Sequence, residues 1–166
     1  MRKIVGLIAC AAVLTFALSC TQQVVKEQPK VAADNTFLPV SNSQLSKFPV
    51  SGFAYKSAKV PAQEWDKWAV VAAPAVKGIV DNIPDGYVLE VRGHTDARGP
   101  ENAMGDKPGN LKISSDRARA VYDSLSKAGI KSNKITYRGV GSSEPLANAD
   151  PSSAQQRRVT FMIVPK

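Results

Sequence analysis

Hydrophobic periodicity constrains the possible fold of this chain more than any other feature does. From residue 48 onward, patterns typical of strands alternate with patterns typical of helices. Residues 87–94 alternate with a period of two, with Tyr87, Leu89 and Val91 facing one way. Other segments repeat at three- and four-residue steps, as one face of a helix does. The patterns predict strands at 48–55, 87–94, around 135–137 and at 159–163, and helices at 62–83 and about 114–128.

The first predicted helix follows Pro61, a residue suited to a first helical turn. Pro74 lies inside the pattern and should kink the helix. The two tryptophans are expected to pack in the core, with a binding platform as the alternative. The apolar face of this helix comprises Trp65, Trp68, Ala72, Val76, Ile79 and Ile83.

The second predicted helix starts near Ser114, which can cap it, and Asp116 in the first turn favours the helix dipole. Gly129 is expected to end it. Its inner stripe is Ile113, Arg117, Val121 and Leu125.

The predicted order is β-α-β-α-β-β within one domain. Helices that alternate with strands require at least part of the sheet to be parallel. We therefore expect an α/β (α+β) fold, with a mixed sheet and helices packed on one face.

The N-terminus has the order of a secretory signal: positive charge at Arg2 and Lys3, then an apolar stretch over 4–18 and a polar continuation. That stretch is short for a membrane span, which needs about 20 residues. Residues 1–19 are therefore predicted to be a signal peptide that directs the chain out of the cytoplasm.

Cleavage before Cys20 would resemble bacterial lipoprotein processing, in which this cysteine carries the lipid. Two alternatives remain open. Residues 17–19 also fit an ordinary signal-peptidase site, and residues 7–10 fit a lipid box ending at Cys10. Residues 20–47 are predicted to be the lipidated cysteine and a flexible tether, with 48–166 as the folded domain. A short strand at 37–40 would make that boundary less sharp.

Composition narrows the function classes. Both cysteines lie in the first 20 residues, and His94 is the single histidine. The predicted domain therefore has too few of these residues for a metal site built from cysteine or histidine ligands. The formal net charge of +8 comes from scattered basic residues, which does not favour nucleic-acid binding. Ser114 has no base beside it, and no catalytic constellation is present. We expect no enzyme activity, no metal and no cofactor.

Four sequence blocks follow one another in the predicted domain. The first is Gly93-His94-Thr95-Asp96-x-x-Gly99, and the second is Asn110-x-x-Ile113-Ser114-x-x-Arg117-Ala118. The third is Gly139-Val140-Gly141 with Glu144-Pro145, and the fourth is Gln156-Arg157-Arg158-Val159. In these blocks and their order the chain resembles the OmpA-like peptidoglycan-binding domains, and in layout it is most similar to the family's peptidoglycan-associated lipoproteins.

The resemblance implies a binding site for the diamino acid of the peptidoglycan stem peptide. Asp96 would take its ammonium group and Arg117 its carboxylate, with Asn110 and Ile113 supporting the pocket floor and Thr95 beside them. A guanidinium suits a carboxylate because it binds it bidentately. On the residues alone, Asp96 and Arg117 could instead form a salt bridge between loop and helix.

Two departures from the family pattern bear on the site. Asp96 and Arg117 lie farther apart than usual, and residues 104–109 look inserted, which could reshape the pocket rim. Gln156 stands where the family has Asn. Of Arg157 and Arg158, one is expected to pair with an acid beneath the site and the other to be solvated. His94 is expected to pack or hydrogen-bond locally.

The favoured function is an outer-membrane lipoprotein that faces the periplasm and holds peptidoglycan without covalent chemistry. The implied partners are peptidoglycan, the membrane through the lipid anchor, and Tol-like envelope proteins, with no nucleic acid. The alternatives are a soluble periplasmic or surface interaction module, an inner-membrane device and a wall hydrolase.

Overall fold

The computed structural model describes residues 36–166. The predicted signal peptide, Cys20 and most of the predicted tether lie outside the described residues. The main elements are α1 (Phe37–Leu45), α2 (Ala62–Val71), α3 (Ala73–Asp81), β1 (Tyr87–Gly93), α4 (Asn110–Lys127), β2 (Ile135–Gly139) and β3 (Val159–Pro165), with short 3-10 turns η1 (Ser132–Lys134) and η2 (Ala154–Gln156). No helix in this part of the chain combines the length and apolarity of a membrane span.

The three strands form one mixed sheet in the order β2-β1-β3. β1 runs parallel to β2, with Leu89 opposite Ile135, and antiparallel to β3, with Leu89 opposite Ile163. The α/β fold with a mixed sheet is therefore confirmed.

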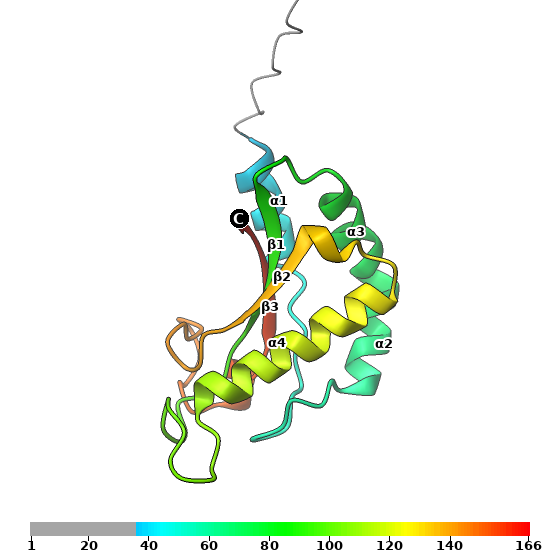
Figure 1. Cartoon of the computed structure of the whole chain (residues 1–166). Coiled ribbons are helices and arrows are strands. Elements are labelled where there is room, and N and C mark those ends of the chain that lie inside the picture. Colours follow the sequence, from blue (N-terminus) through cyan, green and yellow to red (C-terminus); the bar gives the residue numbers. More distant parts are fainter. Residues whose placement is uncertain (1–35) are drawn as a thin grey trace, which may run out of the picture. The chain divides into compact units, whose positions relative to one another are not determined.

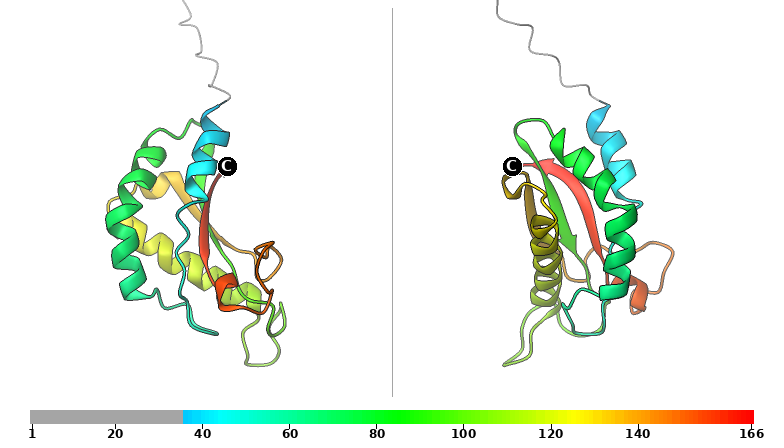
Figure 2. Two further views of the ribbon diagram at one scale, coloured as in Figure 1. Left: turned by 180° about the vertical axis from the view of Figure 1, so that it is seen from behind. Right: turned by 90° about the vertical axis from the view of Figure 1, so that its right-hand side faces the viewer.

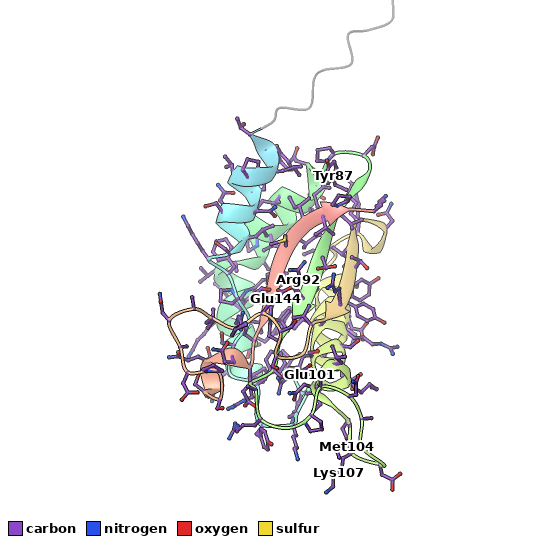
Figure 3. All side chains as sticks on the ribbon, turned by 90° about the vertical axis from the view of Figure 1, so that its left-hand side faces the viewer. Tyr87, Arg92, Glu101, Met104, Lys107 and Glu144 are labelled. Carbon is purple, nitrogen blue, oxygen red and sulfur yellow. The ribbon has the colours of Figure 1, made fainter. Side chains whose placement is uncertain are left out.

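One face of the sheet carries the core. Leu89, Val91, Phe161 and Ile163 are buried there, together with apolar side chains from α2, α3 and α4. Figure 1 and the right-hand view of Figure 2 show these three helices over the same face. The alternation predicted for 87–94 is thus correct, because Leu89 and Val91 enter this core and Arg92 points to the opposite face, seen in Figure 3.

The strand predicted at 48–55 is reduced to one bridge, in which Val50 pairs with Val159. Gly52 takes a left-handed conformation (φ 86°), which turns the backbone away from β3 after that contact. Phe53 is nevertheless 1% exposed and belongs to the core.

Residues 37–45, assigned above to the tether with a possible short strand, form helix α1. Leu45 is fully buried in the core. The Asn42 side chain bonds the free edge of β3: its Oδ1 accepts from the Ile163 N–H at 2.7 Å, and its Nδ2 lies 3.4 Å from the Ile163 carbonyl. Because α1 packs on β3, the folded region begins before residue 48.

The predicted helix 62–83 is two helices, α2 and α3, which meet at Ala72. Pro74 lies in the first turn of α3, where its missing N–H costs nothing, so the expected kink is a full break. Trp68 packs in the core, stacks on Trp65 with ring centroids 5.1 Å apart, and donates its indole N–H to the Phe48 carbonyl. The core interpretation of Trp68 is confirmed.

Helix α4 begins at Asn110, a full turn before the predicted start, and Ser114 does not cap it. The N–H groups of Asn110 and Leu111 donate to the carbonyls of Pro100 and Glu101 instead. Ser114 Oγ donates to the Leu111 carbonyl and accepts from the Gly141 N–H.

Gly129 ends α4 as predicted, with φ 85°. The Ile130 N–H donates to the Leu125 carbonyl and the Gly129 N–H to the Ser126 carbonyl, which is the Schellman arrangement. Leu125 and Ile130 are both buried, so the cap joins the core.

Two paired glycines let α4 approach the sheet closely. Gly93 and Gly139 lie opposite each other on β1 and β2. A Cβ on Gly93 would collide with the Ser114 carbonyl oxygen, and one on Gly139 would collide with the Ser115 backbone. This contact brings the first half of α4 against the carboxyl ends of both strands.

Candidate functional site

Asp96 lies just past the end of β1 and is 2% exposed. Two guanidinium groups hold its carboxylate: Arg98 Nη2 at 2.7 Å and Arg157 Nη1 at 2.8 Å, both on Oδ2. The backbone N–H of Arg98 also donates to Oδ1, at 3.2 Å. Of the two consecutive arginines, Arg157 is the one that pairs with an acid at the site.

The carboxyl of Asp96 stays ionised despite its burial. Burial by itself raises its pKa, but the hydrogen bonds from Arg98 and Arg157 outweigh this, and the net pKa is lowered. The site therefore holds a permanent buried negative charge at neutral pH.

Arg117 lies in the second turn of α4, not in the first turn as expected, and is 1% exposed. Its Nε donates to the Ser57 carbonyl at 2.7 Å, Nη1 to the His94 carbonyl at 2.8 Å and Nη2 to the Ala54 carbonyl at 3.0 Å. The guanidinium thus fastens α4 to the end of β1 and to residues 54–57.

The salt bridge between Asp96 and Arg117, which was the alternative interpretation of these residues, does not form, because each group has other partners. The two charges nevertheless influence each other. Burial lowers the pKa of Arg117 to about 10, repulsion from Arg157 adds to this, and Asp96 opposes it. Asp96 and Arg117 therefore belong to one electrostatic cluster.

Residues 54–57 form a turn in which the Ser57 N–H donates to the Ala54 carbonyl. Lys56 in this turn has φ 55°, the one non-glycine positive φ among residues 36–166. Such a conformation is uncommon outside glycine and costs about 1–2 kcal/mol. Arg117 bonds the first and last carbonyls of the turn and so keeps it in place.

A cavity of about 320 Å³ lies beside this cluster, lined by Lys56, Arg98, Gly99, Pro100, Met104, Lys107, Pro108, Asn110 and Ile113. Asn110 and Ile113, the two residues expected at the pocket floor, both line it. The 104–109 segment folds as a tight hairpin in which Met104 and Lys107 exchange backbone hydrogen bonds. Figure 3 shows this hairpin at the opposite end of the molecule from Tyr87. It contributes three residues of the rim.

Thr95 is buried, and its Oγ1 has no hydrogen-bond partner among residues 36–166. Its backbone N–H donates to the Gly141 carbonyl, which joins the Asp96 loop to residues 139–144. Glu101 strengthens that joint, because its carboxylate accepts from the backbone N–H and the hydroxyl of Ser142.

His94 and Arg158 lie on the other side of the sheet from the helices. His94 Nε2 is 2.8 Å from Thr160 Oγ1, so the local role expected for this histidine agrees with the geometry. Burial lowers the pKa of His94 to about 3, helped by repulsion from Arg158 and Arg92. Arg158 is 7% exposed and bonds the carbonyls of Gln156 and Glu144, so the expectation that it is solvated is wrong.

Gln156 is 1% exposed, and its side chain bonds the backbone of residues 146, 149 and 150. On the face of the sheet away from α2, α3 and α4, Arg92 pairs with Glu90 and with Glu144. Figure 3 shows Arg92 and Glu144 side by side. Among the described residues no group of three or more His, Cys, Asp or Glu could hold a metal.

The sequence did not single out Arg98, and although Phe53-x-x-x-Ser57 fits the family's first strand and turn, it gave Tyr55 and Lys56 no role at the site. The Arg98 guanidinium lies 4.3 Å from the centre of the Tyr55 ring. The available signal was a basic residue two positions after Asp96, close enough along the chain to pair with it. The pattern over 48–55 predicted Tyr55 as a strand residue, but Tyr55 lies in the turn that Arg117 holds.

The model of the OmpA family matches residues 72–158, from the junction of α2 and α3 to the start of β3. This chain belongs to the OmpA family. The match covers the Asp96 loop, the 104–109 hairpin, α4 and both consecutive arginines.

Three solved OmpA-like structures resemble the chain. The peptidoglycan-associated lipoprotein of Burkholderia pseudomallei is 26% identical, with TM-score 0.56 over 77% of this chain and 99% of that one. The OmpA-like domain of FopA1 from Francisella tularensis is 23% identical (TM-score 0.53; 70% of this chain, 71% of that one). The C-terminal domain of Helicobacter pylori MotB is 18% identical (TM-score 0.53; 71% and 84%).

A curated relative is photosystem I P700 chlorophyll a apoprotein A2 of Gloeobacter violaceus, 33% identical over 112 residues. The match takes in 60% of this chain but spans only 12% of that protein. The likeness concerns one segment of a much longer chain.

Proposed function

We propose that this OmpA family domain binds peptidoglycan non-covalently through the cavity beside Asp96. The observation that carries the proposal is a buried, ionised carboxylate directly behind a cavity: Asp96 pairs with Arg98, and Arg98 lines the cavity together with two lysines, Asn110 and apolar groups. The similar Burkholderia protein is named as peptidoglycan-associated, and the match extends over 99% of its structure. These points support a ligand that carries an ammonium group and a carboxylate together.

The proposed ligand is the diamino acid of the stem peptide. Its free ammonium group binds Asp96, because a buried carboxylate gains most from a compact cation that replaces an existing partner. Thr95 adds the buried hydroxyl that lacks a partner within the described chain, and Asn110 and Ile113 form the floor.

Arg117 is proposed as the partner of the ligand carboxylate. Its three carbonyl bonds leave a second N–H on each terminal nitrogen. Since the side chain is 1% exposed, direct contact requires the 54–57 turn to move aside. Binding is therefore expected to involve a local rearrangement of this turn.

We further propose that residues 1–19 are a signal peptide and that Cys20 carries a lipid anchor. The domain then faces the periplasm from the outer membrane and tethers that membrane to the wall, with Tol-like envelope proteins as partners. No catalytic step is part of this function. Metabolic labelling with a fatty acid, comparing the full chain with Cys20→Ser, tests the anchor. Equal labelling of both would refute lipidation at Cys20.

Co-sedimentation of the full chain with purified peptidoglycan sacculi tests the binding. We expect the wild type to sediment and Asp96→Asn to remain in solution. Asp85→Asn is the matched control, because Asp85 is exposed in the turn before β1, at the far end of that strand. It should sediment like the wild type.

Two results would contradict the proposal. If the wild type stays in solution, the domain serves as an interaction module without wall binding. If soluble muropeptides appear during incubation, the protein is a wall hydrolase.

A further inference from the structure

The cavity beside Asp96 is distinctly basic. Lys56, Arg98 and Lys107 line it from three separate segments, and no carboxylate is among its lining residues. Lys107 comes from the 104–109 hairpin, and Lys56 from the turn that Arg117 holds. A cavity of this charge favours a ligand with more negative charge than a single zwitterion has.

The two arginines on Asp96 differ in how easily they can leave it. The Arg157 side chain is 13% exposed, and its Nε is tied to the Phe53 carbonyl at 2.7 Å. The Arg98 side chain is 45% exposed, and its guanidinium lies 4.3 Å from the centre of the Tyr55 ring. Because Arg98 is half-exposed and no backbone carbonyl among residues 36–166 holds its guanidinium, it is the partner that a ligand can more easily replace.

We propose, on the basis of the function proposed above, that Arg98 occupies the place of the ligand's ammonium group until the ligand arrives. The ammonium displaces Arg98 from Asp96, while Arg157 stays. The freed guanidinium remains on Tyr55 at the cavity wall and binds a carboxylate of the ligand. The exchange keeps Asp96 paired throughout.

Lys56 and Lys107 extend this anion-binding region. Neither side chain has an ion-pair partner within the described chain, although the Lys56 ammonium lies over the Tyr55 ring at 5.3 Å. With Arg98 they can meet two or more carboxylates around one ammonium. The site therefore selects stem peptides whose carboxyl groups are free over peptides in which those groups are amidated.

Calorimetric titration of the full chain with two soluble peptides tests this selectivity. The first is L-alanyl-γ-D-glutamyl-diaminopimelate, and the second is the same peptide with its glutamyl and side-chain carboxyl groups as carboxamides. The wild type should bind the free-acid peptide at least about tenfold more tightly. Lys107→Gln should reduce that ratio severalfold, and Lys131→Gln, an exposed control between α4 and β2, should preserve it.

Arg98→Gln is the most informative substitution. It removes the group that competes with the ligand's ammonium for Asp96, and it also removes the group that binds the ligand's carboxylate. We expect it to bind the amidated peptide more tightly than the wild type does and the free-acid peptide more weakly. A purely structural role for Arg98 would weaken both. Lys56→Asn, which tolerates the left-handed conformation, should lower only the preference for free carboxylates.

The failures are distinguishable. Equal wild-type affinity for both peptides overturns the selectivity and leaves wall binding intact. If Arg98→Gln lowers the affinity for both peptides by the same factor, the proposed replacement of Arg98 by the ligand's ammonium group is overturned. If the wild type binds neither peptide, the proposed stem-peptide function and this inference fall together.

Discussion

Arg117 of α4 donates a hydrogen bond from Nη1 to the carbonyl oxygen of His94, 2.8 Å away, and thereby joins the helix to the end of β1. Its neighbours along the same helical stripe, Ile113 and Val121, are apolar and buried. A guanidinium can occupy such a position because three backbone carbonyls satisfy it. The same bonds fix the turn that borders the cavity.

Arg117→Lys should therefore destabilise the fold. A lysine ammonium cannot reach all three carbonyls, and hydrogen bonds to a charged donor contribute about 1.5–3 kcal/mol each. We expect the free energy of unfolding, measured with urea, to fall by about 3 kcal/mol. Arg119→Lys, at an exposed site on the same helix, should change it little. Equal effects of the two substitutions would mean that the carbonyl contacts carry no stability.

Asp96→Asn should cost stability as well as binding. It leaves Arg157, 13% exposed, beside Arg117 without the carboxylate that offsets their repulsion. Because Arg98, the other partner of Asp96, is half-exposed, we expect the free energy of unfolding to fall by about 2 kcal/mol at pH 7.

The effect of Asp96 should depend on pH. Its folded pKa lies below the unfolded value of 3.8, so its contribution is full above that pH and is lost as the pH falls through the folded pKa. Wild type and Asp96→Asn should converge in unfolding free energy as the pH falls below 3.8. A gap that stays constant across this range would exclude a charge effect.

The single histidine should give stability a slope at mildly acidic pH. Burial lowers the folded pKa of His94 from 6.5 to about 3, so the unfolded chain binds a proton more readily between these values. Stability is then full above about 6.5 and declines as the pH falls, by up to about 1.4 kcal/mol per unit. Urea unfolding between about pH 5 and 6.5 should show this slope in the wild type and lose it in His94→Gln. Parallel curves would mean that His94 is not buried as a neutral ring.

The close approach of α4 to the sheet can be tested by substituting alanine for Gly93, with Gly78 as a control. Gly93→Ala places a Cβ against the Ser114 carbonyl and should cost about 2 kcal/mol or more. Gly78→Ala, inside α3 with open space around it, should gain about 0.5–1 kcal/mol from helix propensity. Thermal melts should therefore shift in opposite directions. A neutral Gly93→Ala would show that helix and sheet can separate without cost.

The sequence predicted β3 and the stripe of α4 well, because their side chains alternate between core and solvent over enough residues to set a period. It predicted β1 from the alternation of apolar and polar residue types, although Glu90 on the second face is also buried. It missed the start of α4, since backbone carbonyls of Pro100 and Glu101 replace a side-chain cap, and backbone contacts leave no mark in residue types. The short α1 was missed because its face is defined by one buried leucine and by Asn42 on a strand edge.

For the site, the family blocks named Asn110 and Ile113, which line the cavity, and Asp96, which pairs with the lining residue Arg98. They did not indicate the partners of Asp96 and Arg117. Those partners depend on how the 54–57 turn, distant in sequence, lies against α4, which tertiary packing decides. The sequence shows that Asp96 and Arg98 are two residues apart. It does not show that the Tyr55 ring lies against the Arg98 guanidinium.

The two hydrogen bonds between Asn42 and Ile163 have a mechanical consequence. Any tension on the N-terminal side of the described chain enters the fold at α1, where the Asn42 side chain bonds the edge of β3. Beyond it the load meets the single Val50–Val159 bridge. We therefore expect the Asn42–Ile163 hydrogen bonds to break under tension and α1 to detach. The chain then lengthens while β1, β2 and α4 keep the cavity intact.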